Sequence, residues 1–305
     1  MGIQIQNIST TKGKALKVFG WMLVAAYTFV LPNVYLIYRN ILESYGSEVV
    51  GKIPVILVAI CAILYAAAVL ISQKSLQNLL FLVPCAVIAV LIIKLVDNPN
   101  KHIHIPEYVL MTWLLFFVLF KDHKGKGIFL LIFIYASLLG VVDELEQGIH
   151  PRRFYGVSDM IVNSASALIG IFTILGLKKV IATNWEWKKR LKDFKPLLAL
   201  GAFGLSGAIL MCIYLFQVQA YESFLEVYPE WLLIWNILYQ ILTPLLVVFY
   251  FLNHKKQHQE LRGKNGQTLH QQVITAQCWI YPFLVILFYM HALVVYISIS
   301  GAEFR

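Results

Sequence analysis

Charged side chains are scarce in this chain. Asp, Glu, Lys and Arg make up 13% of its 305 residues, whereas hydrophobic residues make up 59%; a soluble globular chain is about a quarter charged. Strict alternation of apolar and polar residues is also missing, which excludes a transmembrane β-barrel. The apolar residues instead form blocks of roughly 16 to 22, long enough to cross a bilayer core as helices. We therefore expect an all-α, polytopic transmembrane helix bundle.

The chain has only four cysteines, and they lie inside apolar blocks without the spacing of a metal-binding motif: Cys61, Cys85, Cys212 and Cys278. This arrangement indicates small packing residues rather than a disulfide framework or a zinc site. The histidines near the polar segment 257–272 also lack tight ligand spacing. We expect neither a metal ion nor another cofactor.

Nine apolar blocks are long enough to be membrane spans. The first follows Lys12, Lys14 and Lys17, and it is too long to be the apolar part of a cleavable signal peptide. The predicted spans cover residues 18–38, 53–72, 77–96, 105–120, 127–144, 158–177, 196–216, 231–252 and 274–298.

The net charge of +9 comes from basic residues in the short gaps between these blocks. Such a distribution is typical of topology signals and contacts with anionic lipids, so we do not expect nucleic-acid binding. With the N-terminus inside, 18 of the 25 Lys and Arg residues lie in inner segments and 7 in outer ones. The positive-inside rule therefore predicts nine spans, an inner N-terminus and an outer C-terminus.

Two polar segments stand apart from the other loops, and the charge count places both on the outer side. One runs from Lys101 to Tyr108, and the other from Asp143 to Asn163. Ionisable groups at the membrane boundary cost several kcal/mol unless they are paired, hydrated or functional. Helical spacing places Asp143 near Gln147, and Asp159 near Asn163. The density of polar groups on one side favours a shared site.

Each candidate also has a structural interpretation that the sequence leaves open. Asp159 suits the first turn of a helix, where a carboxylate favours the helix dipole. Asn163 suits hydrogen bonding between helices. Arg153 suits a clamp on the nearby carboxylates, while His104 and Glu107 suit the end of a helix at the membrane interface.

Eight residues in and just after the second polar segment match a pattern close to D-E-x-x-Q, a short loop with P-G-R, and D-x-x-x-N-x-x-G-x-x-x-G. They are Asp143, Glu144, Gln147, Pro151, Arg153, Asp159, Asn163 and Gly170. In this the chain resembles the VanZ-like family of bacterial membrane proteins. An upstream lysine, histidine and aromatic residue of that family are similar to Lys101, His104 and Tyr108. Arg152 and Ser166 stand where the family has glycine. The resemblance covers about residues 77–177.

The resemblance implies a role in the bacterial cell envelope, at the plasma membrane, because the family is named after a protein linked to resistance to a glycopeptide antibiotic. We expect three parts: 1–76 with two spans, 77–177 as the VanZ-like membrane domain of four spans, and 178–305 with a basic inner loop and three spans.

Three functions remain open. The first is binding of a membrane lipid, a lipid-linked cell-wall precursor or another anionic envelope molecule. The second is a membrane-embedded enzyme acting on a phosphate- or glycan-bearing lipid, in which Glu144, Asp143 and His104 act as general acid or base. The third is a lipid or small-molecule transporter. The candidate binding residues are Gln147, Arg152, Arg153, Asp159, Asn163 and Glu107.

Overall fold

We describe the fold from a computed structural model of the chain. It describes residues 2–46, 50–73, 76–96, 98–120, 125, 127–150, 153–177, 191, 194–220, 228–261, 276–301 and 304. All statements below concern these residues. Arg152 and most of the basic loop 178–195 lie outside them.

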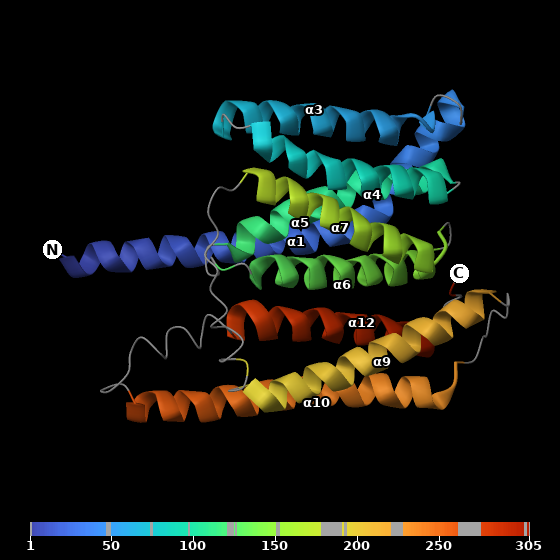
Figure 1. Ribbon diagram of the computed structural model, residues 1–305. Coiled ribbons are helices and arrows are strands. Elements are labelled where there is room, and N and C mark those ends of the chain that lie inside the picture. The colour runs from blue at the N-terminus through green and yellow to red at the C-terminus, as the bar shows by residue number, and fades with distance from the viewer. Residues whose placement is uncertain are drawn as a thin grey trace. The chain divides into compact units, whose positions relative to one another are not determined.

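Within these ranges the regular elements are helices, and nine of them are long and apolar enough to cross a membrane (Figure 1). The expected all-α fold and the number of spans are thereby confirmed, and the chain is a multi-pass membrane protein. The spans contain α1 (Gly2–Tyr45), α3 (Ile53–Gln73), α4 (Leu82–Leu95), α5 (His104–Leu119), α6 (Gly127–Ile149), α7 (Val157–Leu177), α9 (Lys195–Ala220), α10 (Glu230–Leu261) and α12 (Tyr281–Ser300).

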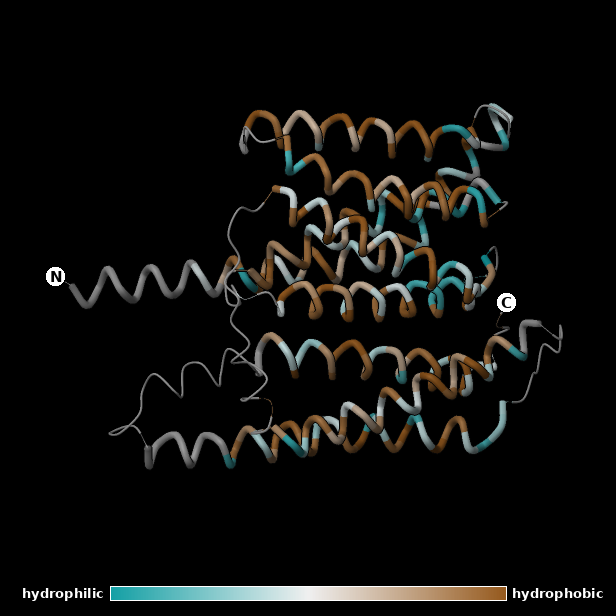
Figure 2. The backbone as a smooth tube through the Cα atoms, in the orientation of Figure 1, coloured by the Kyte–Doolittle hydropathy of each residue, from teal (hydrophilic) through white to brown (hydrophobic). Residues whose placement is uncertain are grey.

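The helix boundaries follow local sequence signals, and hydrophobic residues dominate the helices between them (Figure 2). Pro106 lies in the first turn of α5, where the missing backbone N–H costs no helical hydrogen bond. Helix α6 continues to Ile149, five residues beyond its predicted end, so it carries Gln147 as well as Asp143. The inner position of the N-terminus stays a prediction from the charge count.

The chain forms two compact units, which we describe separately. The first comprises Met1–Lys124, Ile128–Asp143 and Ser158–Ala182; the second comprises Gly125–Gly127, Glu144–Val157 and Thr183–Arg305. Helix α6 thus gives Asp143 to the first unit, and the residues from Glu144 onward to the second.

In the first unit, α5 packs against α1, α3 and α7 at places where small residues allow close approach. A Cβ atom added at Gly170 of α7 would lie 2.6 Å from the Thr112 Cβ atom of α5. The Thr112 hydroxyl donates to the backbone oxygen of Ala167 at 3.4 Å. On the α1 side, a Cβ added at Gly20 would lie 2.7 Å from Val118. These contacts fix the helices that carry the polar residues of this unit.

The second unit contains a bundle of α9, α10 and α12. Three glycines at intervals of three residues on α9 face aromatic rings of the other two helices: Gly201 faces Phe283, Gly204 faces Tyr239, and Gly207 faces Trp235. A side chain at any of them would collide with a ring, since the added Cβ atom would lie within 3.0 Å of it. The glycines therefore let α9 approach α10 and α12 closely.

We predict that Gly170→Leu destabilises the first unit, because the new side chain would overlap Thr112. The expected loss in the free energy of unfolding is about 1–3 kcal/mol, the usual cost of overpacking. Thermal unfolding in detergent, followed by tryptophan fluorescence, measures it. Gly13→Ala is the control, because a Cβ atom there meets nothing within 4 Å. Equal melting of the two variants would contradict the close packing of α5 on α7.

Candidate functional site

Polar side chains of the first unit gather where α5 and α7 begin and where α6 nears its end. We call them the α5–α7 polar cluster. They lie on one side of the membrane, because a chain that enters on α5 returns on α6 and enters again on α7. The members are Lys101, His104, Glu107, Tyr108, Asp143, Asp159 and Asn163, of which all but Lys101 are buried.

The outer layer of this cluster consists of paired charges. Lys101 Nζ lies 2.8 Å from Asp159 Oδ1 and donates to the Ser158 hydroxyl at 2.7 Å. His104 Nδ1 lies 3.0 Å from Glu107 Oε2, one turn along the same helix. Asp159 and Glu107 therefore each lie beside a basic side chain, which reduces the cost of removing the carboxylate from water.

The inner layer of the cluster is farther from the starts of α5 and α7, by one helical turn, than the paired charges. The Tyr108 hydroxyl donates to Asp143 Oδ2 at 3.3 Å and approaches the Leu139 carbonyl oxygen at 3.5 Å. Asn163 is completely buried, and neither its amide nitrogen nor its amide oxygen has a hydrogen-bond partner among the described residues. A Cβ atom at Gly140 would lie 3.4 Å from both the Asn163 nitrogen and the Tyr108 ring. The Asn163 amide thus faces the space beside Tyr108.

A second group of polar residues lies in the second unit, at the end of α6 and in the loop after it. Glu144 accepts from Gln147 Nε2 at 3.0 Å and from the Gly156 backbone N–H at 2.9 Å. Arg153 donates to the Gln147 side-chain oxygen. We call Glu144, Gln147, Arg153 and Gly156 the α6-end clamp, because these bonds hold the loop to the helix that precedes it.

Aromatic contacts support the same loop. The Tyr155 hydroxyl donates to the backbone oxygen of Cys212 at 3.2 Å, and its ring centroid lies 5.1 Å from that of Phe304. Burial of the Tyr155 phenol raises its pKa, and the nearby Cys212 and Glu144 raise it further. Tyr155 therefore stays neutral and serves as a hydrogen-bond donor.

The predicted site residues belong to both compact units. Asp143, His104, Glu107, Asp159 and Asn163 belong to the α5–α7 polar cluster. The other described candidates belong to the α6-end clamp: Glu144, Gln147 and Arg153. The predicted neighbour of Gln147 was Asp143, but its side-chain nitrogen donates to Glu144, three residues away rather than four.

Sequence reasoning missed a polar node in the bundle of α9, α10 and α12. His291 is completely buried, with Nδ1 2.5 Å from Asn236 Oδ1 and Nε2 3.0 Å from the Gly204 carbonyl oxygen. Its ring centroid lies 4.2 Å from that of Tyr239. A histidine in the middle of an apolar span was the available signal, since ionisable residues there need a partner. This node ties three helices together.

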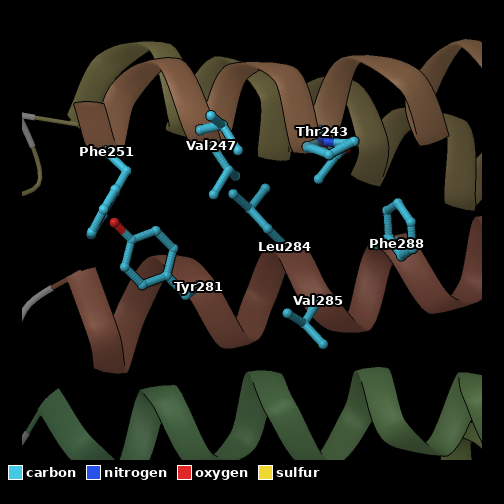
Figure 3. Close-up of a pocket in the computed structure, with 9 residues that line it drawn as sticks. Thr243, Val247, Phe251, Tyr281, Leu284, Val285 and Phe288 are labelled. Atoms are coloured by element: carbon cyan, nitrogen blue, oxygen red, sulfur yellow. The ribbon is translucent and has the colours of Figure 1, made fainter. Parts of the chain in front are cut away.

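An apolar cavity of about 410 Å³ lies between α10 and α12 (Figure 3). It contains none of the predicted site residues. Its lining residues are Thr243, Pro244, Val247, Val248, Phe251, Tyr281, Leu284, Val285 and Phe288.

Comparison of the chain with protein-family models, with curated proteins and with solved structures finds no match. The arguments about function therefore rest on the residues themselves.

Glu144→Gln should lower the free energy of unfolding by about 1–3 kcal/mol, because one of the two oxygens that accept in the clamp becomes a donor facing another donor. Thermal unfolding in detergent measures the change. Glu43→Gln provides the control, because Glu43 is exposed on α1. A Glu144→Gln protein that melts like the wild type would show that the clamp contributes nothing to stability.

Proposed function

We propose that this chain is a VanZ-like membrane protein of the bacterial cell envelope. In this proposal the α5–α7 polar cluster binds the polar head of a lipid-linked or otherwise anionic envelope molecule. The chain resides in the plasma membrane, and the cluster faces the outer side. The observation that carries the proposal is the buried Asn163 amide without a hydrogen-bond partner among the described residues.

A buried amide without a partner costs about 1–3 kcal/mol, since it loses its bonds to water and gains none in the protein. A purely structural asparagine would bond to a neighbouring helix or to its own backbone, as the Asn236 nitrogen does with Leu232. Asn163 instead lies beside Tyr108 and one turn below Asp159. A ligand that reaches the inner layer would satisfy it, which supports binding as the function of the cluster.

The packing below Asn163 favours binding over transport. A transporter needs a polar path to the opposite membrane side, but Gly170 of α7 packs directly against Thr112 of α5. The hydroxyls on this part of α7 bond to their own helix: Ser166 donates to Val162, and Thr173 to Gly170. Between α5 and α7 the polar groups at this depth are therefore already satisfied.

An enzyme acting on a phosphate- or glycan-bearing lipid is the second candidate, and one contact favours it. Glu107 lies against His104 Nδ1, an arrangement that orients an imidazole and strengthens it as a base. Asp143 is the second possible acid–base group of this unit. Glu144 suits catalysis less well, since both of its oxygens accept bonds within the clamp.

Native mass spectrometry of the protein extracted with bacterial lipids tests the binding proposal. We expect a bound lipid-linked or anionic envelope molecule on the wild type and at least a tenfold loss of occupancy on Asn163→Leu, because the ligand would lose its inner hydrogen bonds. Asn33→Leu is the matched control, since Asn33 is exposed and bonds to its own helix.

Melting temperatures separate folding from binding in the same experiment. Asn163→Leu should melt at or above the wild-type temperature without ligand, because the buried unsatisfied amide is gone. Equal lipid occupancy on wild type and Asn163→Leu would sink the proposal.

A further inference from the structure

His104 and Asp159 lie at a spacing that suits two ligands of one metal ion. A ring nitrogen of His104 and a carboxylate oxygen of Asp159 lie within 4.8 Å of each other, and both residues are buried. Ligand atoms bound about 2.0–2.2 Å from one ion lie roughly 3 to 4.4 Å apart. The two side chains come from different helices, α5 and α7, so their approach is a property of the fold and not of sequence neighbours.

Glu107 gives His104 the orientation found in metal sites. Metal-binding histidines usually donate their second ring N–H to a carboxylate, which fixes the tautomer and makes the other nitrogen a better ligand. His104 Nδ1 lies 3.0 Å from Glu107 Oε2, close enough for this carboxylate to orient the ring.

Asn163 is an independent observation that points to a ligand at the same place. It lies one helical turn below Asp159 on the same face of α7, buried and without a hydrogen-bond partner among the residues that the structure describes. Its amide faces the space beside Tyr108, whose hydroxyl donates to Asp143. Amide and carboxylate oxygens are ligands of hard divalent cations.

The charge of the cluster also favours a cation. Glu107, Asp143 and Asp159 supply three carboxylates, whereas Lys101 supplies one ammonium and His104 a neutral or singly charged imidazole. Lys101 lies at the rim, with its side chain 28% exposed, and its ammonium lies 2.8 Å from Asp159. A metal ion bound to Asp159 would compete with this ammonium, which is exposed enough to turn away.

We propose that the α5–α7 polar cluster binds one divalent metal ion of the kind that accepts mixed nitrogen and oxygen ligands, Zn²⁺ or Mn²⁺. His104 and Asp159 are the primary ligands, Asn163 contributes its amide oxygen, and Glu107 positions His104. This inference deepens the proposed function and rests on the same cluster: a bound ion neutralises the carboxylates and gives an anionic head group a positive partner. The mixed ligand set fits these ions better than Mg²⁺ or Ca²⁺, which favour oxygen alone.

The amount of metal bound to the purified protein tests the proposal directly. The full chain, purified without a histidine tag and stripped with EDTA, is dialysed in parallel against Zn²⁺, Mn²⁺, Mg²⁺ and Ca²⁺, and bound metal is counted by inductively coupled plasma mass spectrometry. We expect about one Zn²⁺ or Mn²⁺ per chain, with affinity lowered at least tenfold in His104→Gln and in Asp159→Asn.

His102→Gln is the matched control. His102 lies two residues away and is buried like His104, but its Nε2 bonds to the Val96 backbone oxygen at 3.0 Å. It should keep the wild-type affinity. Metal bound equally by His104→Gln and the wild type, or no bound metal in the wild type, would overturn the proposal.

Lys101→Met separates a metal site from a structural ion pair. Without the competing ammonium, metal affinity should rise about tenfold or more, and added Zn²⁺ or Mn²⁺ should restore the melting temperature that the variant loses. A structural pair alone predicts the same loss of stability with no recovery on adding metal, and that result would also overturn the proposal.

The lipid measurement distinguishes this inference from the proposed function. Lipid bound equally well after EDTA treatment would refute the ion as the partner of the head group and leave the binding function intact. Metal bound with no lipid occupancy would support the ion and refute the binding function.

Discussion

A bilayer core offers no water to a buried polar group, so each one must find a partner inside the protein or in a ligand. This constraint organises the whole chain. Its long apolar helices satisfy their backbone groups internally, and their hydroxyl residues bond back to their own helices, as Thr28, Ser166 and Thr243 do. Among the described residues, a buried side chain without a partner, such as Asn163, marks a place where a ligand can bind.

The α6-end clamp and the α5–α7 polar cluster meet this constraint in different ways. In the α6-end clamp, Glu144, Gln147, Arg153 and Gly156 lie within a stretch of thirteen residues, and three bonds join them. Such a group holds a loop in place. The α5–α7 polar cluster instead collects side chains from three helices, and it contains a buried amide that no described residue satisfies. Because of that difference we propose ligand binding for the cluster and a structural role for the clamp.

The helical fold and the number of spans could be predicted from the sequence, because span length and hydropathy are properties of single segments. Nine spans were predicted, and nine helices of that kind are present in the described part of the chain. The candidate site was predicted as a set of residue types, but not as an arrangement. Whether Gln147 meets Asp143 or Glu144 depends on side-chain rotamers and on the Gly156 backbone. The His291 node depends on the packing of three helices that have no sequence signal in common.

The most direct test of the central claim is an electron cryo-microscopy map of the protein in nanodiscs of bacterial lipid, examined in the space between His104, Asp159 and Asn163. We expect density there that the polypeptide does not explain, within bonding distance of the Asn163 amide. A map in which the Asn163 amide bonds to protein groups and the space is filled by side chains would contradict it.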